Sequence, residues 1–98
     1  MGLLIHIKAD GKTEERIVSS APDLEELQQM VGGYIEVVWV RHKGRRTAMI
    51  VNEDGYRLGL SVNPRASQIY QATALFVGQT TDHMIVGDAV ILEGVSLE

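Results

Sequence analysis

The sequence predicts an α+β fold, in which a mainly antiparallel sheet of about five strands packs with two short helices. Apolar and polar residues alternate over several short runs, as half-buried strands require. Turns that contain glycine join neighbouring runs, which favours antiparallel hairpins. Two other segments carry a helix-capping residue close to a proline, the pattern of a helix start. A chain of 98 residues suffices for one domain, which we place at residues 1–98.

The N-terminal part of the chain predicts a hairpin at one edge of the sheet. Residues 3–8 alternate in polarity and are expected to form its first strand. Asp10-Gly11 predicts a type I′ turn, because both residue types tolerate the positive φ that this turn requires. The return strand over 13–18 is heavily charged early on, and charges at a sheet edge discourage pairing with other chains.

A helix is expected next, and its end is sharply marked. Ser20 is placed as the N-cap, with Asp23 three residues later completing a capping box. The expected buried stripe consists of Leu24, Leu27 and Val31, with Met30 beside it. Gly32 and Gly33 end the helix, since glycine accepts the left-handed conformation of a helix C-terminus.

A second hairpin follows these glycines. The run 34–42 is apolar on both faces, which predicts a central strand, or one whose second face meets a helix or another subunit. Residues 43–45 form the turn, and 46–52 returns as the next strand. A further tight turn over 52–55 leads into a short segment at 56–60.

The remaining chain predicts a helix and a strand. Asn63 is placed as the N-cap and Pro64 as the first helical residue. The residues expected to line this helix are Ala66, Ile69, Tyr70 and Thr73. Its end is open, since 75–77 fits either a helical extension or a short strand. The final strand over 84–92 is interrupted by Gly87-Asp88, which indicates a bulge or a bend.

Composition excludes several classes of protein. The chain has no cysteine, and therefore no disulfide, thiolate metal site or cysteine nucleophile. No run approaches the roughly 18 apolar residues of a membrane helix, and the N-terminus lacks the pattern of a secretory signal. We therefore expect a cytoplasmic protein that does not contact a membrane. The net charge of -4 argues against a nucleic-acid partner, which normally requires a basic surface.

The sequence also shows no catalytic or metal-binding pattern. His6, His42 and His83 lie at no spacing typical of metal ligands. Adjacent carboxylates fall where an edge strand, a first helical turn and a tight turn explain them, and no serine lies in a nucleophile-elbow motif. We expect a protein that is not an enzyme and that holds neither metal nor cofactor.

One basic segment stands out in this acidic chain. Residues 41–46 contain four cations, which form either a solvated turn or a site for phosphate groups bound by arginine forks. Arg65 follows the expected N-cap Asn63, and a helix N-terminus also attracts anions. Gly32-Gly33 has one glycine more than a helix end needs, so Gly33 either only ends the helix or admits a ligand beside Tyr34.

These observations define the predicted ligand site. The predicted ligand-binding residues are Gly33, Tyr34, Glu36, Arg41, Arg45, Arg46, Asn52 and Arg65. In this prediction the arginines bind phosphates and Tyr34 stacks on a base, while Glu36 or Asn52 contacts a base or ribose edge.

The chain also resembles a small family of unknown function found in phages and other mobile elements. The resemblance rests on the block Val31-Gly32-Gly33-Tyr34-Ile35-Glu36, on Asn52-Glu53-Asp54-Gly55, on Asn63 with Ala66, and on Ile85-Val86-Gly87-Asp88. It covers the chain from about Leu24 to Val90, whereas the basic segment 41–46 lies outside it, and the expected Leu-Pro pair before Asn63 is missing. The resemblance implies a small accessory protein of phages and implies no activity.

Two hypotheses about function follow. The first is a homo-oligomeric phage protein that sequesters a phosphorylated small molecule, such as a cyclic nucleotide or cyclic ADP-ribose signal of the immune systems CBASS and Thoeris. This anti-defence sponge hypothesis is our inference, and the resemblance alone does not imply it. The second is a protein-binding inhibitor of a host defence or restriction enzyme, whose acidic N-terminal third is the contact face. A DNA-binding accessory domain is a third interpretation, which the net charge disfavours.

Overall fold

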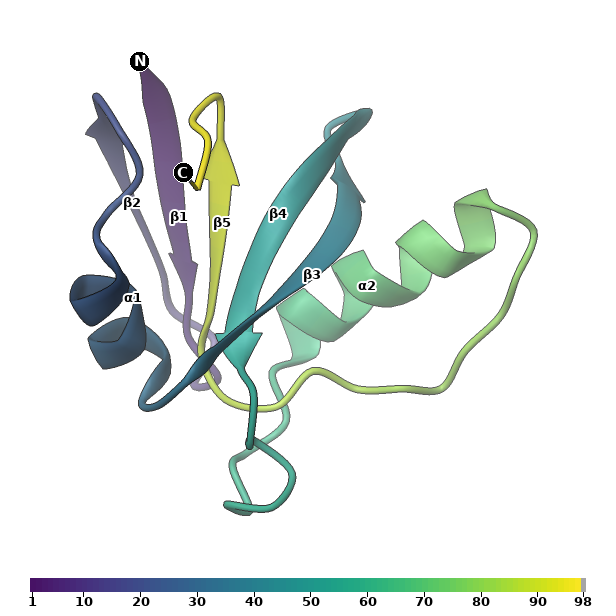
Figure 1. The fold of residues 1–98 in the computed structure, drawn as a ribbon. Coiled ribbons are helices and arrows are strands. Elements are labelled where there is room, and N and C mark those ends of the chain that lie inside the picture. Colours follow the sequence, from purple (N-terminus) through teal and green to yellow (C-terminus); the bar gives the residue numbers. More distant parts are fainter. Residues whose placement is uncertain (98) are drawn as a thin grey trace.

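The computed structural model describes residues 1–97 and shows one five-stranded antiparallel sheet in the order β2-β1-β5-β4-β3 (Figure 1). The strands are β1 (Gly2–Ile7), β2 (Thr13–Val18), β3 (Ile35–His42), β4 (Arg45–Asn52) and β5 (Ala89–Glu93). The helices are α1 (Leu24–Val31) and α2 (Pro64–Phe76). The predicted α+β fold, with five strands and two helices, is confirmed.

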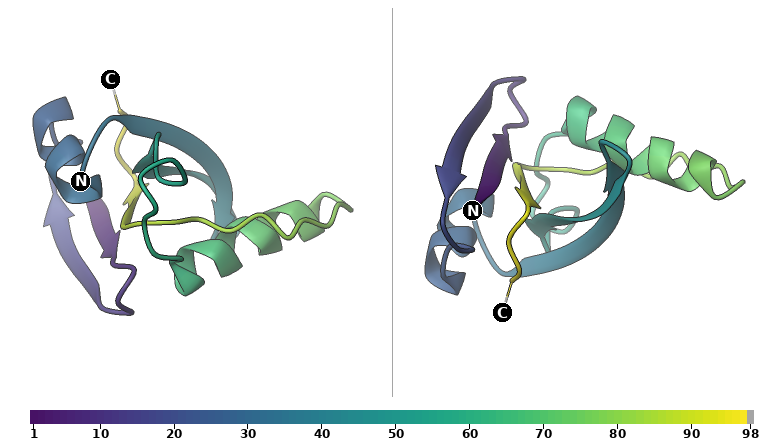
Figure 2. Two further views of the ribbon diagram at one scale, coloured as in Figure 1. Left: turned by 90° about the horizontal axis from the view of Figure 1, so that it is seen from below. Right: turned by 90° about the horizontal axis from the view of Figure 1, so that it is seen from above.

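Each face of the sheet is buried against one helix. α1 places Leu27 and Val31 against the strand residues Ile50 and Val90 on one face. α2 packs against β3 on the other face and joins a core that contains Met49 and other buried residues. Figure 2 shows that α2 projects beyond the sheet, so its C-terminal end is largely exposed.

The β1–β2 hairpin lies at the sheet edge, as predicted, but its turn is not type I′. Gly11 has a φ of 96°, whereas Asp10 has no positive φ. Instead, the Lys8 amide donates to the Lys12 carbonyl at 2.8 Å, and the Asp10 carboxylate accepts from the Lys12 amide at 2.9 Å. The loop is therefore longer than a two-residue turn, and Gly11 in it adopts the left-handed conformation. The Asp10 side chain stabilises this loop by its hydrogen bond with the loop backbone.

The first helix begins later than predicted. Asp23 is the N-cap and accepts from the Glu26 amide at 2.9 Å, so the assignment of Ser20 was wrong. Aspartate caps as well as serine does, and the later start places Pro22 before the cap. As a consequence Leu24 is 56% exposed and does not belong to the buried stripe. Gly32 ends the helix with a φ of 83°, as predicted.

β3 is an edge strand, so the expectation of a central strand was wrong. The alternative was right, because α2 covers the second apolar face of β3. The Thr73 hydroxyl of α2 accepts from the Arg41 amide at 2.8 Å and satisfies a donor at the strand edge. A helix that covers an edge strand in this way shields it from pairing with other chains.

Asn63 fixes the start of α2, as predicted for the N-cap. Its side chain is fully buried and accepts from the Ala66 amide at 3.1 Å. It also donates to the carbonyls of Ile7 at 2.9 Å and Gly87 at 3.0 Å. Gly87 has a φ of 79° and makes the predicted bend, so the final strand begins only at Ala89. The end of α2, for which the sequence allowed either a helical extension or a short strand, is helical through Phe76.

Candidate functional site

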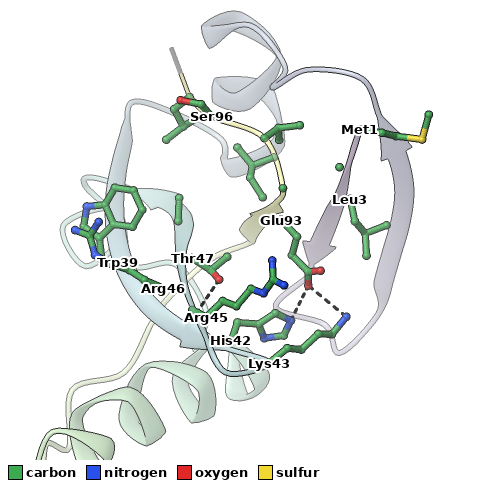
Figure 3. A pocket seen from close by; sticks show the side chains of 16 residues that line it. Met1, Leu3, Trp39, His42, Lys43, Arg45, Arg46, Thr47, Glu93 and Ser96 are labelled. Carbon is green, nitrogen blue, oxygen red and sulfur yellow. Dashed lines mark hydrogen bonds and ion pairs between the residues drawn. The ribbon is translucent and has the colours of Figure 1, made fainter.

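The end of the β3–β4 hairpin that carries its turn separates from the rest of the sheet. β5 pairs with β4 only over Ala48–Ile50, so residues 45–47 pair with β3 alone. After β5 the chain turns at Gly94, whose φ is 74°. A cleft of about 740 Å³ lies between this turn, the start of β1 and the hairpin (Figure 3). Ligand sites commonly have volumes of roughly 300–1,000 Å³.

The centre of this hairpin cleft is a charged cluster. The Glu93 carboxylate lies 3.0 Å from Nε2 of His42 and 3.3 Å from Nζ of Lys43 (Figure 3). Glu93 is the one carboxylate among the lining side chains of the described residues. It partly neutralises Lys43 and lies beside the His42 ring at the end of the hairpin.

Two arginines add positive charge that this carboxylate does not balance. The guanidinium of Arg46 lies 4.0 Å from the centre of the Trp39 ring, a cation–π contact that holds it at the rim. Within residues 1–97, no carboxylate forms an ion pair with Arg45. The cleft therefore carries a net positive charge within a chain of net charge -4.

Apolar residues complete the lining of the cleft. They include Leu3, Ala48, Leu92, Val95 and Leu97. An apolar wall with arginines and a tryptophan at its rim suits a ligand that has a flat body and an anionic group, because arginine forks bind phosphate and aromatic rings stack. Among the described residues no group of three His, Cys, Asp or Glu side chains is arranged to hold a metal ion.

The structure brings together only part of the predicted ligand site. Arg45 and Arg46 line the cleft, whereas Gly33, Tyr34 and Asn52 lie at the opposite end of the β3–β4 pair. At about 3.3 Å per residue, the length of the β3–β4 pair separates the two groups by about 20 Å. One small ligand in one chain cannot contact both.

Asn52 and Gly33 have structural roles where the prediction placed ligand contacts. The Asn52 amide donates to the Val31 carbonyl at 3.1 Å, and its oxygen accepts from the Asp54 amide at 2.7 Å. A Cβ on Gly33 would lie 2.9 Å from Nδ2 of Asn52, so packing against this amide accounts for the second glycine. Tyr34 beside them is exposed.

The other three predicted residues lie at separate places. Glu36 lines a second hollow, together with residues of α2 and of the segment after it. The Arg41 guanidinium lies 3.9 Å from the centre of the Phe76 ring on α2. Arg65 is exposed in the first turn of α2. None of them lines the hairpin cleft.

Sequence reasoning did not select Trp39, His42 or Glu93 as site residues. Trp39 could have been found from the hairpin register, since a two-residue turn at Lys43-Gly44 puts Trp39 and Arg46 on one face. Glu93 could not have been found in this way, because it reaches the hairpin through the long-range pairing of β5.

The fold and the cleft together define a small α+β protein with a cationic, aromatic-rimmed surface cleft. A family model described as a domain of unknown function, DUF3846, matches residues 3–96, and the chain belongs to this family. No curated protein and no solved structure is significantly similar to the chain. Within the described residues, no helix is long and apolar enough to cross a membrane.

Proposed function

We propose that the protein is a non-enzymatic binding protein that holds a phosphorylated small molecule of the nucleotide class in the hairpin cleft. The observation that supports this most is an arginine whose charge no carboxylate neutralises, next to an arginine that lies on a tryptophan ring at the rim of the cleft. Arg45 lacks an acidic partner among the described residues, and Arg46 is held on the Trp39 ring beside it. Phosphates would bind the arginines, and a base would pack against the apolar wall.

The finer proposal concerns the origin and identity of the ligand. The resemblance to phage and mobile-element proteins supports a role inside an infected bacterial cell. A nucleotide immune signal, such as a cyclic nucleotide or cyclic ADP-ribose, is anionic and planar and so fits the cationic cleft with its aromatic rim and apolar wall. The protein would then act as an anti-defence sponge, since binding alone removes the signal.

A thermal-shift panel tests the proposal directly. Cyclic dinucleotides, cyclic trinucleotides and cyclic ADP-ribose isomers are each added to the purified chain. A ligand at a hundredfold excess over its Kd stabilises the fold by about 2.7 kcal/mol. The double variant R45A/R46A should lose the shift, whereas K12A/R57A, which removes the same charge outside the cleft, should keep it. Absence of a shift with every compound contradicts the nucleotide-signal proposal.

The proposal also includes a homo-oligomer. The apolar face of β3 that motivated this expectation is covered by α2 within the chain. The exposed apolar residues Leu75, Phe76 and Val77 at the end of α2 are the surface that now supports it. Light scattering of the wild type should give a mass above that of one chain, and a strict monomer would contradict it.

The alternative, an acidic inhibitor that binds a defence enzyme, has weaker support. Glu14 pairs with Lys8 and Glu26 with Arg16, so part of the proposed acidic face is already neutralised. A pull-down that recovers one defence protein and no small molecule would favour the inhibitor over the sponge.

A further inference from the structure

A second hollow, of about 440 Å³, lies on the α2 side of the sheet and takes no part in the proposed function. Its walls come from β3, the end of β4, α2 and the irregular segment after α2, which returns along the helix (Figure 1). Three rings and one acid line it, namely Tyr56, Tyr70, His83 and Glu36. No lysine or arginine does so within residues 1–97. Its chemistry is thus opposite to that of the hairpin cleft.

The three rings form one continuous wall. The His83 ring lies between the two tyrosines, with centre-to-centre distances of 5.5 Å to Tyr56 and 5.3 Å to Tyr70. The interplanar angles are 52° and 58°, so the rings are tilted and present both edges and faces. The electron-rich faces of such rings attract organic cations.

Hydrogen bonds hold this wall in place without a ligand. The Tyr56 hydroxyl donates to the Met84 carbonyl. The Gln71 amide donates to the His83 carbonyl at 3.1 Å, and Ser67 exchanges hydrogen bonds with the backbone of Ile85. The segment that carries His83 is therefore fixed to α2 and to the turn after β4, and a ligand would meet rings that are already ordered.

Glu36 supplies the only formal charge on the lining side chains that the structure describes, with His83 neutral. It is exposed at the rim, and no lysine or arginine of the described chain forms an ion pair with it. A carboxylate beside aromatic faces suits a guanidinium group best, because that group is planar, stacks on rings and forms paired hydrogen bonds with a carboxylate. An ammonium group offers only a compact point charge.

We propose that this second hollow binds a guanidinium group, with the rings stacking on its plane and Glu36 accepting its hydrogen bonds. The group could belong to a free small molecule or to an arginine side chain of a partner protein, since both present the same chemistry. The hollow is a separate site from the hairpin cleft, so this inference does not depend on the proposed function.

The test is an NMR titration that follows the ring protons of His83 in the full chain. The probes are butylguanidine, the capped tripeptide acetyl-Gly-Arg-Gly-amide, and pentylamine as a cation of the same charge without the planar fork. We expect saturable shifts at His83 with the guanidinium probes, and at least about tenfold weaker binding of pentylamine. Tighter binding of the tripeptide than of butylguanidine would identify a protein segment as the source, and the reverse order would identify a small molecule.

Two exposed carboxylates provide the matched variants. Glu36→Gln removes the charge from the hollow, and Glu25→Gln removes one from α1 on the opposite face. Butylguanidine should bind E36Q at least about tenfold more weakly and E25Q as tightly as wild type. Any of four results would overturn the proposal. These are unsaturable shifts with both guanidinium probes, equal binding of pentylamine, unchanged binding to E36Q, and equal losses of binding in both variants.

Discussion

Replacing Asn63 with alanine should be among the most destabilising substitutions of a polar residue in this protein. The side chain caps α2 and also bonds the carbonyls of Ile7 and Gly87, so it joins β1, α2 and the bend before β5. Loss of a helix cap costs about 1 kcal/mol. Each buried carbonyl left without a donor costs about 1–3 kcal/mol more. We expect a loss of about 3–7 kcal/mol, a large part of the roughly 5–15 kcal/mol by which a typical domain is stable.

Asp23→Ala is the matched control for this substitution. The Asp23 side chain caps α1 by accepting one exposed hydrogen bond from the Glu26 amide, and it makes no other hydrogen bond or ion pair among the described residues. Its removal should therefore cost only about 1 kcal/mol. Urea denaturation of both variants, followed by circular dichroism, gives the two free energies of unfolding. An Asn63→Ala loss no larger than that of Asp23→Ala would refute the reasoning.

Asn63→Asp separates the cap from the two donated bonds. The carboxylate keeps the acceptor for the Ala66 amide but faces the carbonyls of Ile7 and Gly87 without a proton to donate. We expect a loss at neutral pH at least as large as that of Asn63→Ala. When the variant is compared with wild type at acid pH, part of this lost free energy of unfolding should be recovered, because a protonated carboxyl donates one hydrogen bond.

Two further predictions concern packing and charge. Gly33→Ala should destabilise the fold by about 1–3 kcal/mol, because the new Cβ would lie 2.9 Å from the hydrogen-bonded Asn52 amide. Urea denaturation measures this loss, and a change within about 0.5 kcal/mol would contradict the role of Gly33 in packing. The hydrogen bond to Glu14, and then its charge, raise the pKa of Lys8 above its ordinary value. The stabilisation from this pair is therefore present at neutral pH and is lost as the pH rises through the raised pKa. NMR titration of the Lys8 side chain in Glu14→Gln should show a lower pKa, and an unchanged one would exclude this cause.

The elements that local pattern controls could be predicted from the sequence. The charged strand β2 occupies the predicted residues, and Asn63 with Pro64 starts α2 as expected. The first helix start was wrong because two capping residues, Ser20 and Asp23, compete within one short segment, and the position of the buried stripe decides between them. Such competition is settled by tertiary packing, which pattern alone does not contain.

The candidate site was less predictable, because its residues come together through long-range pairing. The basic segment 41–46 was recognised as charged, yet the cleft exists only because β5 leaves β4 at Ala48. Glu93 enters the cleft from β5, far along the chain. Sequence proximity instead grouped Tyr34 and Asn52 with the arginines, although an extended hairpin places them at opposite ends.

Mapping of ligand contacts tests the central claim most directly. The backbone amides of the ¹⁵N-labelled chain are followed by NMR while members of the cyclic nucleotide panel are added. We expect saturable shifts that cluster at residues 42–47 and 93–95, and their loss in R45A/R46A. Shifts that cluster at residues 33–36 and 52, or no saturable shift with any member of the panel, would contradict the assignment of the hairpin cleft as the binding site.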